Sequence, residues 1–185
     1  MKLMIASDLH GSDYYTAELL KAFERERAGK LLLLGDILYH GPRNDLPREY
    51  APKKVIERLN ALSGRVLSVR GNCDAEVDQM VLNFPVLSDS CLLFCGGRTI
   101  FATHGHLFHK ENLPPLAKGD ILLHGHTHVP ALEIHENYIY MNPGSVSIPK
   151  ENSPHVYMTL EAGTFLWKTL EGEIYRTFSP EEETE

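Results

Sequence analysis

Five short polar clusters that can bind metal ions are spaced along this chain, and most of them directly follow an apolar run typical of a β-strand. Strand ends on one edge of a sheet lie close together, so clusters far apart in the sequence can form one site. The pattern therefore favours a sheet whose strand ends converge on a polynuclear metal centre. In chain order the clusters are Asp8-Leu9-His10, Gly35-Asp36, Gly71-Asn72-Cys73-Asp74, His104-Gly105-His106 and Gly125-His126-Thr127-His128.

Strand and helix signals alternate in the first half of the chain. Residues 2–6, 31–34 and 65–69 are short apolar runs, whereas residues 16–28 and 53–62 carry apolar side chains at helical spacing. A strand–helix–strand order predicts parallel pairing with right-handed crossovers.

The second half predicts further strands, with one hairpin near its start and another at its end. Two stacked mixed β-sheets flanked by helices, a four-layer α/β/β/α sandwich, would bury all of these strands. One long loop, residues 37–52, is rich in Gly, Pro, Arg and Asn, and loops of this length are often functional. The strands expected in this half are residues 91–94, 99–103, 120–123, 138–141, 156–160, 164–169 and 173–177.

Composition narrows the class of protein. With 185 residues and a net charge of −7, we expect one domain over residues 1–178, an acidic disordered tail over 179–185, and no binding of polymeric nucleic acid. No apolar run is long enough to span a membrane. The cysteines Cys73, Cys91 and Cys95 form no Cys-x-x-Cys motif, so we expect no disulfide framework and a cytoplasmic location.

The residue types in the clusters match the ligands that divalent metal ions prefer. Asp8 and His10 are two residues apart, so in an extended strand they would face the same side and share one ion. Asp36 has two carboxylate oxygens and can bridge two ions. The side chains that would complete the two coordination shells are Asn72, His104, His126 and His128.

Each cluster alone has an ordinary structural explanation. Asp8 and His10 could be a turn residue and a surface histidine, and Gly-Asp and Gly-Asn are common turn signals. The joint pattern is harder to explain in this way, because five of the ten histidines lie at two strand ends. We therefore favour a metal site over a set of unrelated turns.

The order of the clusters resembles the signature of the calcineurin-like metallophosphoesterase family, from Asp8 to the segment at residues 142–145. The short length and the loop around residues 39–44 resemble the small YfcE-type bacterial phosphodiesterases. The resemblance implies the α/β/β/α sandwich and two divalent ions, most readily Mn²⁺, although iron, zinc and nickel also suit the ligands. It implies one ion held by Asp8, His10, Asp36 and His128, and a second held by Asp36, Asn72, His104 and His126.

Other residues near the ligands are candidates for catalysis. The candidate catalytic residues are Asn72, Asp74 and His106. A carboxylate such as Asp74 could fix the tautomer of a metal-bound imidazole. Many family members have histidine where this chain has Cys73. The cysteine is either a small space-filling residue or a catalytic or metal-binding thiol, and a thiol is a poor substitute for imidazole.

The long loop supplies the candidate substrate-binding residues. Arg43 could clamp a phosphate or be a solvated surface residue, and Tyr39 and His40 could line a leaving-group pocket. Cys73 completes this set. His124 has an ordinary explanation as a strand-end residue.

These observations predict a phosphodiesterase in which a hydroxide bridging two divalent ions attacks a small phosphodiester in line. A weak general acid at Cys73 would favour good leaving groups of the aryl type. A phosphomonoesterase or pyrophosphatase with the same site is an alternative, and so is a binding scaffold like the retromer subunit of this fold. We expect no membrane partner, and the chain could form a homo-oligomer.

Overall fold

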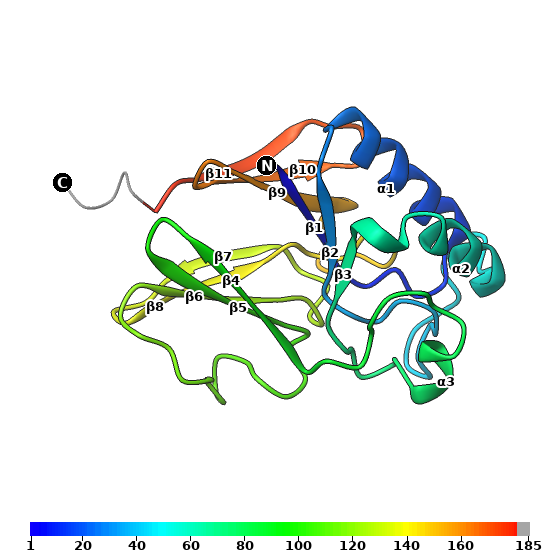
Figure 1. The fold of residues 1–185 in the computed structure, drawn as a ribbon, viewed down its shortest axis with the longest axis horizontal. Coiled ribbons are helices and arrows are strands. Elements are labelled where there is room, and N and C mark those ends of the chain that lie inside the picture. Colours follow the sequence, from blue (N-terminus) through cyan, green and yellow to red (C-terminus); the bar gives the residue numbers. More distant parts are fainter. Residues whose placement is uncertain (181–185) are drawn as a thin grey trace.

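The computed structural model describes residues 1–180 and contains two mixed β-sheets packed face to face (Figure 1). The six-stranded sheet consists, in spatial order, of β11 (Ile174–Phe178), β10 (Thr164–Thr169), β9 (Val156–Glu161), β1 (Leu3–Ala6), β2 (Lys30–Leu33) and β3 (Val66–Ser68). The five-stranded sheet consists of β4 (Ser90–Cys95), β5 (Arg98–Thr103), β6 (Asp120–His124), β8 (Tyr138–Asn142) and β7 (Ala131–Ile134).

The central strands are apolar throughout because both of their faces are buried. In β1, Met4 and Ala6 belong to the core beneath α1 (Asp13–Arg25) and α2 (Pro52–Asn60), while Leu3 and Ile5 belong to the core between the sheets. Strands β1, β2 and β3 pair in parallel, as the alternation of strands and helices predicts. The carboxyl ends of these strands therefore lie at one edge.

The predicted pair of mixed sheets is confirmed, but the two outer layers differ. Helices α1 and α2 cover the outer face of the six-stranded sheet (Figure 1). The outer face of the five-stranded sheet is covered by residues 104–119, which contain no helix. Phe108 of this segment packs edge-on against Phe101, with ring centroids 5.3 Å apart. Leu116 packs against the cluster formed by Leu122, Tyr138 and Tyr140.

Element boundaries differ from the predictions where capping outweighs apolar spacing. Helix α1 begins at Asp13 rather than at residue 16, because the Ser12 side chain accepts a hydrogen bond from the backbone N–H of Tyr15. The four-residue helix α3 (Glu76–Gln79) and the edge strand β7 were not predicted. Both are too short to give a periodic signal.

The structure describes only part of the C-terminal segment. Ser179 lies 3.0 Å from Thr164 through their hydroxyl oxygens. The rest of the predicted acidic tail, residues 181–185, lies outside the described residues. None of the helices within residues 1–180 combines the length and apolar character needed to cross a membrane.

A buried carboxylate at the end of α1 ties this helix to β9, to β10 and to the residue before β1. Glu26 accepts hydrogen bonds from Lys168 at 2.7 Å, from the Tyr157 hydroxyl at 2.9 Å and from Lys2 at 3.1 Å. Burial alone would raise the pKa of Glu26, but these donors outweigh burial and lower the pKa below its ordinary value of 4.5.

We predict that Glu26→Gln lowers the free energy of unfolding by about 1–2 kcal/mol at pH 7, because Lys168 loses its partner. A carboxyl group whose pKa is lower in the folded protein stabilises the folded state at pH values above its pKa in the unfolded chain. This stabilisation disappears as the pH falls through the pKa of the group in the folded protein. The difference between variant and wild type should therefore shrink below pH 4.5. Urea denaturation at several pH values measures it, with Glu57→Gln on α2 as the exposed control, and an equal loss in both variants would contradict the prediction.

Candidate metal centre

The structure brings the predicted ligands together where the carboxyl ends of strands from both sheets meet. Asp8 and His10 follow β1, Asp36 follows β2, and Asn72 follows β3 in the first sheet. The second sheet contributes the remaining three: His104 directly after β5, and His126 and His128 after β6. Of these seven, only Asn72 is exposed and His126 half-buried.

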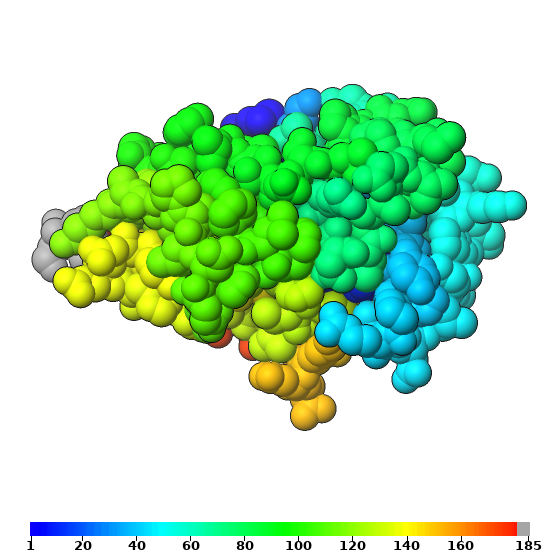
Figure 2. Space-filling view, turned by 90° about the horizontal axis from the view of Figure 1, so that it is seen from below, coloured from blue at the N-terminus to red at the C-terminus, as the bar shows by residue number. Residues whose placement is uncertain are grey.

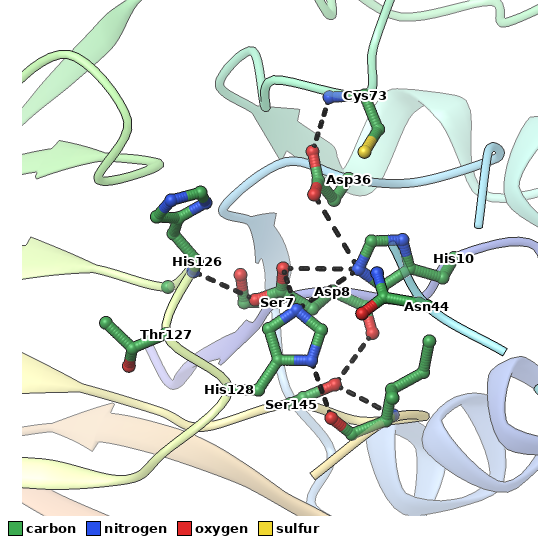
Figure 3. Close-up of polar contacts among 12 residues, drawn as sticks. Ser7, Asp8, His10, Asp36, Asn44, Cys73, His126, Thr127, His128 and Ser145 are labelled. Carbon is green, nitrogen blue, oxygen red and sulfur yellow. Dashed lines mark hydrogen bonds and ion pairs between the residues drawn. The ribbon is translucent and has the colours of Figure 1, made fainter. Parts of the chain in front are cut away.

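Four side chains converge on a first position, as Figure 3 shows for Asp8, His10, Asp36 and His128. The Nε2 atoms of His10 and His128 are 3.3 Å apart. Asp8 Oδ1 lies 3.5 Å from His10 Nε2 and 3.3 Å from His128 Nε2. Asp36 Oδ2 lies 3.6 Å from His10 Nε2.

Backbone carbonyls fix the tautomers of both imidazoles. His10 Nδ1 donates to the Tyr39 carbonyl at 2.8 Å, and His128 Nδ1 donates to the Ile148 carbonyl at 2.6 Å. Each neutral ring then has a lone pair and no proton on Nε2. Two imidazole lone pairs therefore face the carboxylate of Asp8 with no hydrogen between them, an arrangement that a cation would satisfy.

A second position has the same character. His104 Nδ1 donates to the Leu34 carbonyl at 2.6 Å, so its Nε2 also carries a lone pair. Around this atom lie Asn72 Oδ1 at 3.1 Å, His126 Nδ1 at 3.1 Å and Asp36 Oδ1 at 3.5 Å. The two carboxylate oxygens of Asp36 thus face the two positions separately, which suits a bridging ligand.

The electrostatics of these side chains favour a bound positive charge. Asp8 Oδ2 accepts from the backbone N–H of His126 at 3.1 Å, but the fully buried Oδ1 has no hydrogen-bond partner. Burial lowers the pKa of His10, yet the nearby carboxylates of Asp8 and Asp36 outweigh burial and raise it. Burial, followed by the neighbouring His104, lowers the pKa of His126 to about 4. The residues present fit two divalent cations.

The backbone at the ligands departs from the extended form expected for Asp8 and His10. Both residues have left-handed backbone, with φ of 59° and 47°. The same holds for Asp36 at 54°, His126 at 67° and His128 at 63°. Residues other than glycine rarely adopt this conformation, which costs about 1 kcal/mol or more each. The side chains therefore converge through strained turns rather than through strand alternation.

Asp74 positions Asp36, the predicted bridging ligand. Its Oδ2 accepts from the backbone N–H groups of Asp36 at 2.8 Å and Gly71 at 2.7 Å, and its Oδ1 accepts from that of Ile37 at 2.9 Å. Asp74 therefore does not fix an imidazole tautomer, as the sequence suggested, but holds the turn that carries Asp36. Gly71 is required beside it, because a side chain there would overlap the Asp36 carboxylate.

Sequence reasoning missed the serines that hold the first ligand turn. The hydroxyls of Ser145 and Ser147 donate to the Asp8 carbonyl at 3.0 and 2.9 Å. Ser145 also accepts from the backbone N–H of Ile148, whose carbonyl orients His128. The segment after β8 thus links two ligands from different sheets. Its only sequence signal was its place at the end of the family resemblance.

Two cavities adjoin the metal positions and share Arg43, Asn72, His126 and Thr127. The larger has a volume of about 700 Å³, and His106 is part of its lining. The smaller has a volume of about 390 Å³.

Two of the four candidate substrate residues, Arg43 and Cys73, line these cavities, and the other two do not. Cys73 lines the smaller cavity, and its Sγ lies within 4.8 Å of ligand atoms of His10 and Asp36. Tyr39 and His40 line neither cavity, contrary to expectation: the His40 ring packs edge-on between those of Tyr39 and Tyr50.

His124 reaches the larger cavity although the sequence suggested an ordinary strand-end residue. Its ring packs against Tyr140 at 4.7 Å, and its Nδ1 donates to the Gly125 carbonyl. Burial lowers the pKa of His124 to about 4.

Comparison with known proteins settles the family. The model of the calcineurin-like phosphoesterase superfamily domain matches residues 1–164. The chain belongs to this superfamily. Phosphodiesterase YfcE of Escherichia coli K12 is 51% identical over 161 residues, covering 87% of this chain and 88% of that protein. The probable metallophosphoesterase YsnB of Bacillus subtilis is 27% identical over 174 residues, covering 87% and 85%.

Solved structures agree with the family assignment. The phosphoesterase YfcE from E. coli matches with a TM-score of 0.93 and 47% identity, over 97% of this chain and 99% of that one. Vacuolar Protein Sorting 29 from Cryptosporidium parvum, at 16% identity and a TM-score of 0.61 over 96% and 97%, shares the fold alone. The chain is therefore a metallophosphoesterase, a hydrolase of ester bonds whose family uses divalent metal ions.

We predict that Asp36→Asn weakens metal binding at both positions, because an amide offers a single neutral oxygen where a carboxylate serves two ions. After loading with Mn²⁺ and desalting, elemental analysis should find about two ions per wild-type chain and fewer in the variant. The exposed Asp45→Asn makes the same chemical change in the long loop and should retain the wild-type content. Retention of full metal content by Asp36→Asn would rule out the bridging role.

Proposed function

We propose that this metallophosphoesterase is a phosphodiesterase that hydrolyses small phosphodiesters with the help of two divalent cations, Mn²⁺ being the best candidate. The observation that carries the proposal is the pair of cavities that adjoin the metal positions and share four lining residues. A phosphodiester has two organic substituents on one phosphorus and can place one in each cavity. A phosphomonoester would leave one cavity empty.

Two bound divalent cations would supply the chemistry that the side chains lack, by making hydroxide available near neutral pH and neutralising the phosphoryl oxygens. The protein's own residues prepare the site for this. Asp8 and Asp36 are the only carboxylates among the seven ligands, so two divalent charges leave the site positive for an anionic ester. The fixed tautomers of His10, His104 and His128 keep their lone pairs on the metal positions.

The remaining side chains would bind and orient the ester. Arg43 lines both cavities and can reach the phosphoryl group with its planar guanidinium. Asn72 lies at the same junction, and its Oδ1 is one of the predicted ligand atoms. His106 lines the larger cavity, with its Nδ1 buried and without a partner, and burial lowers its pKa. His106 can therefore accept a hydrogen bond from the ester or from water.

The function is tested with the Mn²⁺-loaded protein and three matched substrates: an aryl phosphodiester, the corresponding aryl monoester and an alkyl phosphodiester. We expect the aryl diester to have the highest kcat/KM. Removing the metal with a chelator should abolish turnover, and adding Mn²⁺ back should restore it. A clear preference for the monoester would contradict the proposal and favour a phosphomonoesterase.

Cys73 bears on the choice of leaving group. Burial, followed by the charge of Asp36, raises the pKa of its thiol, so the thiol stays neutral and is a weak acid. The Asn72 amide donates to Cys73 Sγ at 3.3 Å, and the backbone N–H of Cys73 donates to Asp36 Oδ1 at 2.8 Å. Without a strong acid at this position, turnover should depend on leaving groups that need no proton.

We predict that Cys73→His raises kcat/KM for the alkyl diester relative to the aryl diester by about tenfold, because imidazole can protonate a poor leaving group. Cys73→Ser removes the thiol without adding an acid of suitable pKa and is the control. The ratio of the two kcat/KM values is the measurement. An unchanged ratio in Cys73→His would remove Cys73 from the account of leaving-group preference.

A further inference from the structure

The smaller cavity carries an excess of positive charge before any metal is bound. Its lining includes Arg43 and Lys150, and its only carboxylate is Asp36, which faces the metal positions. Within residues 1–180 neither cation forms an ion pair with a carboxylate. Both side chains are exposed at the rim. Their charges are therefore available to a ligand.

The larger cavity has the opposite balance. Glu111, Glu133 and Glu151 line it together with the cations Lys110 and Arg43. Lys110 is already paired, because its Nζ lies 2.9 Å from Glu133 and 5.2 Å from the centre of the Tyr140 ring. An additional anionic group would therefore meet repulsion in the larger cavity and attraction in the smaller one.

The two cations are carried by backbone that is tied to the metal site. The backbone N–H of Lys150 donates to the His128 carbonyl at 3.1 Å. Arg43 lies in a tight turn closed by Asn44, whose side chain donates to the His40 carbonyl at 2.9 Å. Figure 2 shows the long loop (light blue to cyan), the turn near residue 150 (orange) and the segment near residue 127 (yellow-green) beside one another on this face. Both cations thus belong to the lining of one cavity, together with Thr127.

We infer that the smaller cavity binds a substituent with a second anionic group, so that the preferred substrates are phosphodiesters carrying an additional phosphate on one side. This inference rests on the proposed phosphodiesterase function and deepens it. The neutral substituent lies in the larger cavity, beside His106. Lys150, which lines the smaller cavity but not the larger one, sets this orientation, because its charge-assisted hydrogen bonds to phosphate oxygens form on that side only.

Two chromogenic esters test the inference: the p-nitrophenyl ester of thymidine 5′-phosphate, and the same ester with a phosphate on the 3′ oxygen. The second should have a kcat/KM about fivefold higher at low ionic strength. Added salt should reduce this preference, because the rim is exposed to solvent. Lys150→Met should lose most of the preference, whereas Lys53→Met, an exposed lysine on α2, should keep it.

A binding measurement separates this inference from the proposed function. Calorimetry compares thymidine 3′,5′-bisphosphate with thymidine 5′-phosphate on the Mn²⁺-loaded protein, and the bisphosphate should bind about fivefold more tightly. Equal affinities, or a preference that survives in Lys150→Met, would overturn the inference. Failure to hydrolyse either ester, with the difference in affinity intact, would count against the phosphodiesterase alone.

Discussion

The structure depends on a set of lone pairs that face one another without a proton between them. At the first position the imidazoles of His10 and His128 meet the unpartnered oxygen of Asp8, and each ring donates its N–H hydrogen bond to a backbone carbonyl. Such an arrangement is repulsive and poorly solvated unless a cation joins it. The burial of these atoms and the tautomers of the two rings therefore favour a bound cation more strongly than the residue types alone do.

The protein sustains this arrangement with strained backbone and a dense set of supporting hydrogen bonds. Five of the seven ligands have left-handed φ values, which persist only where the surroundings enforce them. Asp74 supplies three such bonds around the Asp36 turn, and Ser145 and Ser147 supply two around Asp8. These residues contribute to function by holding others in place, which is why they are buried.

Much of the fold and site could be predicted, because apolar runs mark buried strands and ligand types mark chemistry. The parallel order of β1, β2 and β3 and the convergence of their ends follow from the alternation of strands and helices. The sequence could not reveal that Asp8 has left-handed backbone, since aspartate has no strong preference for it. Nor could it show that main-chain carbonyls such as that of Ile148 orient the imidazoles. The sequence predicted that His40 lines a pocket, whereas the His40 ring packs edge-on against the rings of Tyr39 and Tyr50.

The uneven outer layers of the sandwich have an evolutionary consequence. Residues 104–119 form the non-helical cover of the five-stranded sheet, and Lys110 and Glu111 within it also wall the larger cavity. Surface segments of this kind tolerate insertions and deletions better than the elements they connect. Lineages can therefore remodel the larger cavity by lengthening or trimming residues 107–119, while the turns that carry the candidate ligands, His104 included, and the helix-covered half stay unchanged.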